Sequence, residues 1–431
     1  MNVILATLGD MFKVSKTQIN EIARAFAEEI TLCSGSPSKG SLKMLRSYFT
    51  KPLGGEAGDI IALDFGGTNI RILIVNLGKG NYEIRRQKVF NLARLQAGIN
   101  NGEDLFSFLA AEIEKMINKD QNYLLGHCFS FPSQQISRKS AILLDWSKEI
   151  NFTSLEGKDI NAILAQALIV KGLTNIEVTA LVNDTVGILL ASAYSNPAAD
   201  IGSICGTGHN SCYVETHAGS SYQEIINIEA GGFDHKTLRE NIFDVELDIR
   251  SEKPGSNRLE KMVAGRYLGE ILRLVLLYLV KNKIIFAGLE IPRILKNPYS
   301  INTADLAELL EEDRDKLNGL LKGKWDLAGY TANDLLIIKY IARCIAHRSA
   351  DLIAGTFAGI IRYMNPALNT PHTIATDGSL YEKLPGFSGR IERRVNETFE
   401  TFAGKQAPIE LSLIKDGSGI GAAIAAVMGK V

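Results

Sequence analysis

The feature that most constrains the fold of this chain lies between residues 60 and 75. There, two apolar, strand-like runs are separated by a short polar loop. The loop contains Asp64, the adjacent glycines Gly66 and Gly67, and the hydroxyl of Thr68. Glycine lets a main chain approach a ligand closely, and consecutive backbone amides form a nest that binds anions. A carboxylate at a strand end can hold Mg²⁺ through water, because Mg²⁺ keeps part of its hydration shell. The pattern therefore predicts a β-hairpin that presents amide groups to a phosphate.

A second loop of the same kind lies between residues 201 and 214, where apolar runs flank Gly206, Thr207 and Gly208. Two related hairpins predict a duplicated nucleotide clamp, with one phosphate loop in each half of the protein. The chain contains no Gly-Lys-Ser or Gly-Lys-Thr sequence, which excludes a Walker-type loop. No Gly-x-Gly-x-x-Gly opens a helix after a strand, so a dinucleotide site of the Rossmann kind is not supported. Phosphate binding is expected to depend on hairpin turns.

Charge and composition limit the possible partners. The 431 residues include 47 basic and 48 acidic side chains, with no polybasic or acidic tail. Binding to nucleic acid needs a basic field, so no nucleic-acid partner is expected. The first ten residues lack the basic and apolar regions of a signal peptide, and the apolar segment 268–280 contains two charges and is too short to span a bilayer. We expect a cytoplasmic protein of two to three domains without a membrane partner.

Five scattered cysteines with no Cys-x-x-Cys pair indicate free, buried thiols in a reducing compartment. A disulfide between Cys205 and Cys212, on opposite arms of the second hairpin, is the less favoured alternative. The six histidines have no metal-ligand spacing, so no zinc site is expected.

Apolar periodicity predicts the main helices. They cover residues 15–32, 103–118, 258–281, 304–312 with Thr303 as N-cap, and Thr331 to about Tyr363, where Asp334 completes a capping box.

Polar clusters follow two predicted buried strands, 124–131 and 176–182. In α/β sheets the residues just beyond the strand ends line the ligand crevice. Near the C-terminus the tripeptide Asp-Gly-Ser occurs twice, in Asp377-Gly378-Ser379 and in Asp416-Gly417-Ser418-Gly419. The second copy precedes an Ala-rich helix predicted over 420–428. A glycine-rich helix N-terminus attracts phosphate through free amides and the helix dipole.

With these features the chain resembles the eukaryotic-type hexokinases with a single catalytic unit, from roughly residue 10 to the C-terminus. Together, ordered and spaced, the matching segments are highly specific. They are 63–71, 129–135, 146–148, 182–187, 206–210, 227–233 and 416–419.

The resemblance implies a two-lobed α/β fold of the actin-like ATPase (ribonuclease H-like) superfamily, with a duplicated mixed-sheet core and a cleft between the lobes. The small lobe would comprise residues 57–186 plus 417–431, and the large lobe 1–56 plus 187–416. Such enzymes transfer the γ-phosphoryl of MgATP to the 6-hydroxyl of a hexose, the first step of glycolysis. Glucose is the expected substrate, with fructose and mannose also accepted, and the protein is expected to be a monomer or homodimer.

Four positions depart from the usual pattern of the family. Ser147 replaces a threonine and keeps its hydroxyl, whereas Ala230 replaces a tryptophan, His209 a serine and Ile420 a lysine. The catalytic set is intact. The departures bear on nucleotide affinity and on which hexose fits best.

The resemblance assigns roles to particular residues. Asp184 would take the hydroxyl proton, because phosphoryl transfer needs a carboxylate beside the nucleophile; a cap at a strand end is the plain alternative. Lys148 would neutralise charge on the transferring phosphoryl; a solvated surface lysine is its plain alternative. The substrate-binding set is Ser130, Phe131, Ser147, Lys148, Asn183, Asp184, Asn210, Glu229 and Glu260.

The nucleotide would be held by the two hairpins and the two Asp-Gly-Ser segments, with Asp64 holding Mg²⁺ through water. Glu260 could instead be a carboxylate favoured by a helix dipole, and Ser379 an ordinary turn residue. The nucleotide set is Asp64, Gly66, Gly67, Thr68, Asn69, Arg71, Gly206, Thr207, Gly208, Gly378, Ser379, Gly417 and Ser418.

Three other functions remain open. A kinase for another sugar, such as mannose or an amino sugar, would share every motif. A catalytically weak sugar sensor would keep Asn183, Asn210, Glu229 and Glu260 but lose the base or the phosphate loops. If the chain were an actin-like or chaperone ATPase, the residues expected to bind a sugar would have no function.

Overall fold

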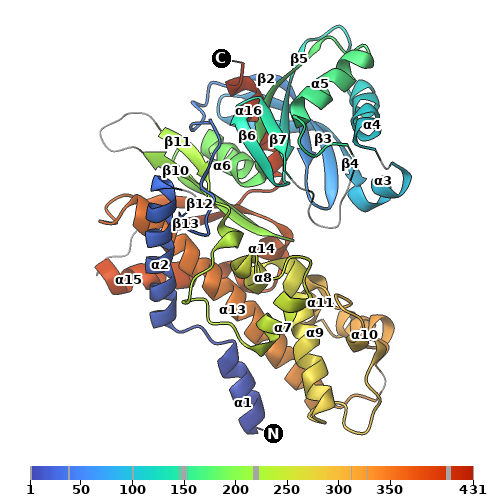
Figure 1. Ribbon diagram of the computed structural model, residues 1–431, viewed down its shortest axis with the longest axis vertical. Coiled ribbons are helices and arrows are strands. Elements are labelled where there is room, and N and C mark those ends of the chain that lie inside the picture. Colours follow the sequence, from blue (N-terminus) through green and yellow to red (C-terminus); the bar gives the residue numbers. More distant parts are fainter. Residues whose placement is uncertain are drawn as a thin grey trace.

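The computed structural model describes residues 2–36, 39–99, 101–144, 146, 152, 154–216, 223–311, 313–327, 329–403 and 409–430. Figure 1 shows one sheet near the C-terminus, a second sheet across the middle of the molecule, and a large group of helices that extends to the N-terminus.

The first sheet has the strand order β4-β3-β2-β5-β8. Strands β2, β3 and β4 form an antiparallel meander, and β5 and β8 continue the sheet in parallel with β2. Helices α4 and α5 cover its outer face with an apolar cluster. The elements of this part are β2 (Gly58–Phe65), β3 (Asn69–Gly78), β4 (Asn81–Asn91), α3 (Leu92–Gly98), α4 (Gly102–Glu114), β5 (Tyr123–Phe129), β6 (Ser133–Ser137), β7 (Ser140–Leu143), α5 (Ile160–Val170) and β8 (Ile176–Val182).

The second sheet repeats this arrangement. Its order is β1-β11-β10-β9-β12-β13, in which β9, β10 and β11 form the antiparallel meander and β12 and β13 are parallel to β9. The predicted duplicated mixed-sheet core is therefore confirmed. The strands are β1 (Leu45–Arg46), β9 (Ala199–Cys205), β10 (His209–Thr216), β11 (Gln223–Asn227), β12 (His372–Asp377) and β13 (Ile409–Leu413).

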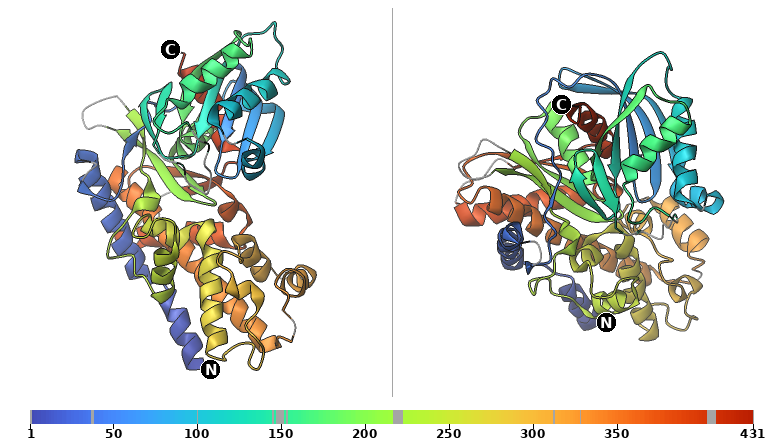
Figure 2. Two further views of the ribbon diagram at one scale, coloured as in Figure 1. Left: turned by 45° about the vertical axis from the view of Figure 1, so that its right-hand side comes forward. Right: turned by 45° about the horizontal axis from the view of Figure 1, so that its top comes forward.

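Helices build the largest apolar cluster against the second sheet. The long helix α13 runs through this layer, between α2 and α15 on one side and α9 on the other (Figures 1 and 2). The elements are α1 (Asn2–Met11), α2 (Lys16–Gly35), η2 (Ala230–Gly232), α7 (Ile242–Arg250), α8 (Arg258–Val263), α9 (Gly265–Lys281), α10 (Arg293–Lys296), α11 (Thr303–Leu310), α12 (Arg314–Asn318), η3 (Gly319–Lys324), α13 (Ala332–Met364), α14 (Ser379–Lys383) and α15 (Phe387–Ala403).

Two further helices lie between the sheets. Helix α16 (Gly417–Met428) packs on β2, β5 and β8, α6 (Asp184–Ser195) packs on β9 and β10, and the two helices pack on each other. Their crossing is close: a Cβ atom added to Gly421 would lie 1.9 Å from the carbonyl oxygen of Gly187. The apolar cluster around them draws residues from both sheets. The proposed lobe boundaries stay predictions, and the one after residue 186 falls within the first turn of α6.

The prediction of one continuous helix over 258–281 is wrong in one respect. The segment forms two separate helices, α8 and α9. Ala264 between them is extended, and the amides of Gly265 and Arg266 donate to the carbonyls of Gly206 and Thr207, at 2.8 and 3.1 Å. A Cβ on residue 265 would lie 2.7 Å from the carbonyl oxygen of Gly206. The break therefore lets the start of α9 dock on the second hairpin.

Other helix ends differ by a few residues. Helix α11 begins one residue earlier than predicted, with Asn302 rather than Thr303 as its N-cap, because Asp305 completes a capping box with Asn302. Helix α4 ends at Glu114 rather than 118, and α16 begins at Gly417 rather than 420. The capping box at Thr331 and Asp334 is confirmed.

All five cysteines are free, as expected. Cys205 pairs in register with His209 and Cys212 with Gly202, so the two thiols do not face each other across the hairpin. In the described part of the chain, no helix combines the length and apolar character that crossing a membrane requires.

The crossing of α6 and α16 gives a stability prediction. Gly421→Ala should lower the free energy of unfolding by roughly 1–3 kcal/mol, the usual cost of overpacking, because the new methyl group meets backbone that cannot rotate away. The midpoint of thermal unfolding measures the loss. Gly98→Ala in α3 is the matched control, since an added Cβ there meets nothing within 4 Å. Equal midpoints for both variants would contradict the tight crossing.

Candidate active site

The first hairpin, between β2 and β3, places its polar residues at one end of the first sheet. The amide of Gly66 donates to the carbonyl of Asn69 at 3.0 Å and closes the turn, which also contains Gly67. Thr68 is exposed at the tip, and its carbonyl accepts from the amide of Leu92 at 2.9 Å. The predicted phosphate hairpin is therefore formed, and its tip is open to solvent.

Asp64 lies at the buried base of this hairpin. It pairs in register with Arg71 across the strands, and Arg71 Nε lies 3.6 Å from Asp64 Oδ2. The Ser418 hydroxyl donates to the same oxygen at 2.9 Å. Burial raises the pKa of Asp64, Arg71 and Ser418 oppose the rise, and the nearby charge of Asp184 adds to it. The carboxylate thus has a cation and a hydroxyl that favour its ionised form.

These residues fit Mg²⁺ bound through water. Mg²⁺ takes one or two carboxylates, several waters and substrate phosphates rather than an all-protein cage. Within the described ranges, no three His, Cys, Asp or Glu side chains gather to ligate a metal directly. The buried carboxylate of Asp64, beside the predicted phosphate hairpin, therefore fits a hydrated ion shared with a nucleotide.

The second hairpin, between β9 and β10, lies beside the segment that starts α14. The amide of Gly206 donates to the carbonyl of Gly208 at 3.0 Å, and Thr207 at the tip is exposed. A Cβ atom on Gly206 would lie 3.5 Å from Cα of Gly378, and the next residue, Ser379, is exposed. The structure thus brings together these two parts of the predicted nucleotide set.

Two aspartates connect this segment to the start of α16. Asp377 accepts the amides of Gly378 at 2.6 Å and Gly417 at 3.3 Å, and burial raises its pKa. Asp416 forms an ion pair with Arg71. Sequence reasoning did not assign either aspartate to the site, although both stand in the repeated Asp-Gly-Ser theme. The nucleotide set therefore converges on one carboxylate-rich region around Arg71.

Asp184 is the first residue of α6 and is 8% exposed. Asn183 caps this helix, with its side-chain oxygen accepting from the amide and hydroxyl of Thr185 at 3.0 and 2.8 Å. Asp184 Oδ1 also accepts from the Thr185 amide at 2.8 Å, and among the described residues no hydrogen bond is formed by Oδ2. The cap role expected as the plain alternative for Asp184 thus belongs mainly to Asn183.

A cluster of amide and carboxylate groups lies at the ends of β10 and β11. Asn210 Nδ2 donates to Asn227 Oδ1 at 2.8 Å and to Glu229 Oε1 at 3.1 Å, and Asn227 Nδ2 donates to the same Glu229 oxygen at 2.9 Å. Lys43 Nζ lies 4.0 Å from Glu229 Oε2. Glu229 has a left-handed backbone, with φ of 58°. Sequence reasoning missed Asn227 and Lys43, although Asn227 stands only two residues before Glu229.

Glu260, in the first turn of α8, joins this cluster to the second hairpin. Its Oε2 accepts the amide of His209 at 3.1 Å. An added Cβ on Gly208 would lie 2.9 Å from that oxygen, and one on Gly231 would lie 3.0 Å from Cβ of Glu260. Glu260 therefore faces the predicted sugar-binding residues as well as the phosphate hairpin, which a residue placed only for the helix dipole would not need to do.

His209, which replaces the usual serine, is buried. Burial lowers the pKa of its imidazole to about 4, so the ring is neutral near pH 7. Its Nδ1 lies 3.1 Å from the carbonyl oxygen of Ile204, and its ring lies near Phe357. The side chain points into the core, and only its backbone amide contacts the site.

The remaining predicted sugar contacts lie beside the first hairpin. The amide of Ser130 donates to the carbonyl of Phe65 at 3.1 Å. The ring of Phe131 is buried against Phe65, Phe129 and Trp146, so its side chain belongs to the core and any substrate contact would fall to its backbone. Ser147 and Lys148 lie outside the described residues.

The sequence was compared with known families and proteins. Family models described as hexokinase match residues 4–194 and 200–428. A hexokinase of Schwanniomyces occidentalis is 33% identical, with 98% of this chain and 92% of that protein covered. A human hexokinase is 30% identical over 97% of this chain, which spans about half of that relative, 47% of its length.

The fold was compared with solved structures. A hexokinase from Schistosoma mansoni complexed with glucose has a TM-score of 0.87 and 31% identity, with 98% of each chain covered. The predicted two-lobed, actin-like α/β fold is confirmed by this likeness. The chain therefore belongs to the hexokinase family, and its prediction as an ATP-dependent phosphotransferase that acts on a hexose is confirmed.

Proposed function

We propose that this protein transfers the γ-phosphoryl group of MgATP to the 6-hydroxyl of glucose and accepts other hexoses. One observation carries this proposal: the amide and carboxylate cluster of Asn210, Asn227 and Glu229 adjoins the second phosphate hairpin, with Glu260 between them. Side chains that both donate and accept suit adjacent sugar hydroxyls. A phosphate hairpin at the same place suits a phosphoryl donor.

In this proposal Asp184 accepts the proton of the 6-hydroxyl as its oxygen bonds to the γ-phosphorus and the bond to the ADP oxygen breaks. Asn183 holds the start of α6 and so fixes the position of Asp184. Mg²⁺, when bound, would neutralise charge on the phosphates, and Asp64 would hold it through water. Arg71 and the amides of both hairpins would orient the phosphates. Lys148 and Ser147 keep their proposed roles on the resemblance alone.

The sugar would be recognised by its hydroxyls. Asn183, Asn210, Glu229 and Glu260 would pair with them, and Ser130 would approach from the side of the first sheet. A site built to pair hydroxyls strongly rejects analogues that lack them. A cytoplasmic location and a monomer or homodimer belong to the same proposal, and the free cysteines support a reducing compartment.

The test is ADP release by the purified protein with MgATP and glucose, fructose, mannose, glucosamine or N-acetylglucosamine, beside a control without sugar. Strong turnover with glucose and little without sugar would support the proposal. A preference for mannose or an amino sugar would reassign the substrate. Sugar-independent release would favour an ATPase, and glucose binding without any turnover would favour a sugar sensor.

Asp184→Asn tests the proposed base. The amide cannot accept the hydroxyl proton, so kcat should fall by about 10²–10⁴-fold, the usual contribution of a general base. Calorimetric titration with glucose should give a dissociation constant close to that of the wild type. Asp120→Asn, in a loop before β5, serves as the control. Near-normal turnover by Asp184→Asn would refute the assignment.

Ser418→Ala tests the ionisation of Asp64. The Ser418 hydrogen bond stabilises the ionised carboxylate and lowers its pKa, so its removal raises the pKa of Asp64 further above the ordinary value. Ionised Asp64 would then be lost at a higher pH as the solution is acidified.

The expected result is that the acid limb of the pH profile of kcat/KM for MgATP moves to higher pH. At neutral pH kcat/KM should fall roughly tenfold, as for the loss of one hydrogen bond to a charged group. Ser195→Ala, whose hydroxyl bonds to the Gly80 carbonyl outside the site, should leave the profile unchanged. An unmoved acid limb in Ser418→Ala would show that Asp64 does not limit the reaction.

A further inference from the structure

A pocket lies away from the residues described above, between α11, α13 and the start of α15. Its volume is about 70 Å³, whereas a single water molecule needs about 10–15 Å³. Its apolar wall includes Leu310, Ala346 and Phe387, and its polar wall is made by Arg343, His347 and Arg390. The pocket has room for a group the size of a phosphate, and no carboxylate is among the residues that line it.

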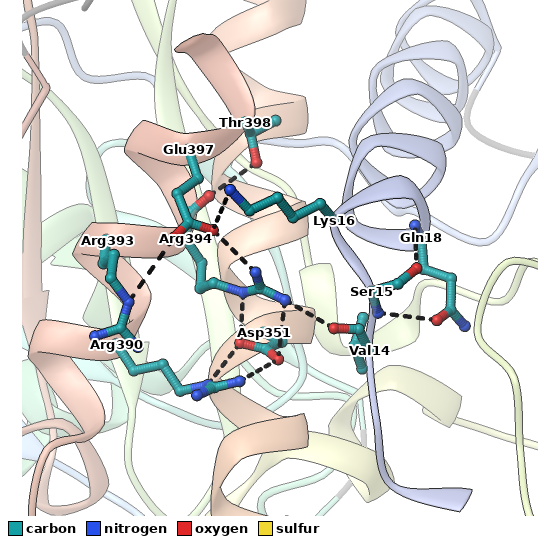
Figure 3. A network of polar contacts seen from close by, with 10 residues as sticks. All are labelled: Val14, Ser15, Lys16, Gln18, Asp351, Arg390, Arg393, Arg394, Glu397 and Thr398. Atoms are coloured by element: carbon teal, nitrogen blue, oxygen red, sulfur yellow. Dashed lines mark hydrogen bonds and ion pairs between the residues drawn. The ribbon is translucent and has the colours of Figure 1, made fainter. Parts of the chain in front are cut away.

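Arg390 belongs to a network of ion pairs in which cations outnumber carboxylates. Its Nε and Nη2 both bind the carboxylate of Asp351 at 2.7 Å, and Arg394 Nε binds the same carboxylate at 3.1 Å. Figure 3 shows Asp351 between these two arginines. The Asp351 side chain is only 2% exposed. Arg394 Nη1 also binds Glu397 at 2.9 Å, and Lys16 and Arg393 pair with the same carboxylate. Four cations therefore share two carboxylates in this network of described residues, which keeps a net positive charge.

Arg343 adds a second positive charge. It is exposed, and among the described residues no carboxylate forms an ion pair with it. His347 lies one turn further along α13. His347 is exposed at the surface. Partial desolvation lowers the pKa of its imidazole, the charges of Arg390, Arg343 and Arg393 lower it too, and the charge of Asp351 opposes them. The neutral imidazole thus experiences a positive field from both helices.

The N-terminus of α15 lies beside the pocket, which Phe387 and Arg390 of this helix line. The amides of Ser388 and Gly389 have no acceptor in the described part of the chain. The first turn of α15 has no acidic residue, so the positive end of the helix dipole is not neutralised by its own side chains. This helix end belongs to the segment that forms one wall of the pocket.

We propose that this pocket binds a phosphate group, either free phosphate or the phosphate of a small monoester. Two guanidinium groups and an imidazole on its wall supply donors from two helices, as recognition of a phosphate requires. The apolar wall excludes water from one side of the bound group. None of the residues that line the pocket belongs to the predicted nucleotide set, so this site is distinct from the proposed nucleotide site. The inference does not depend on the proposed function.

The test is calorimetric titration of inorganic phosphate at constant ionic strength. Saturating glucose and MgADP are present so that the proposed catalytic site is filled. The wild type should bind phosphate, and Arg343→Gln should bind it about tenfold more weakly, the effect of losing one charge-assisted hydrogen bond. Arg24→Gln, an exposed arginine of α2 that does not line the pocket, is the matched control and should bind like the wild type.

Further variants and probes separate the outcomes. Arg343→Lys should recover part of the affinity. Glycerol 3-phosphate, a monoester without a pyranose ring, replaces phosphate in a second titration: binding of both assigns the pocket to monoesters, and binding of phosphate alone assigns it to the free anion. No binding by the wild type, or equal affinity in Arg343→Gln, would overturn the proposal.

ADP release with glucose is measured on the same preparations. Arg343→Gln should keep the kcat of the wild type, because Arg343 lies outside the proposed catalytic site. If the protein releases no ADP, the phosphate titrations are run without glucose and MgADP, and the comparison of variants still decides the proposal. A result that refutes phosphate binding by the pocket can therefore be distinguished from a result that refutes the proposed function.

Discussion

The close crossing of α6 and α16 is the constraint on which the rest of the structure depends. Each helix packs on one of the two sheets, and backbone meets backbone where Gly187 and Gly421 cross. The N-termini of both helices carry polar residues, with Asp184 on α6 and Ser418 on α16. Because Ser418 also binds Asp64 of the first hairpin, this single contact between helices sets the distance from the proposed base to the proposed Mg²⁺ carboxylate.

Electrostatics explains why this region needs cations. Asp64, Asp377 and Asp416 surround Arg71, and all three interact with its charge. Burial raises the pKa of Asp64 and Asp377, and neighbouring carboxylates add to the rise in both. One guanidinium cannot compensate three carboxylates. A divalent cation would relieve this repulsion, so that Mg²⁺ and nucleotide would stabilise the arrangement of segments that binds them.

Local patterns were predictable from the sequence, and contacts between distant segments were not. The two hairpins and the capping box at Thr331 depend on residues close in the chain. The break between α8 and α9 depends on Gly206, nearly sixty residues before Gly265, so helical periodicity could not reveal it. Asn227 was missed for a different reason, since its partner Glu229 is only two residues away and no local pattern marks an asparagine at a strand end as part of a site. The roles of Ser147 and Lys148 still depend on the resemblance alone.

The duplicated sheets contain two equivalent hairpins, and their side chains differ. The difference assigns the proposed Mg²⁺ carboxylate to the first hairpin and the proposed sugar contacts to the second. The last residues before the first turn include Asp64, which pairs with Arg71 across the strands. At the second turn Cys205 pairs with His209, and both are buried and uncharged. Within the two turns, the carboxylate proposed to hold Mg²⁺ through water therefore belongs to the first hairpin. The second instead turns Asn210 toward Glu229 and leaves its amide groups near Glu260, which is why the proposed sugar site forms on that half of the molecule.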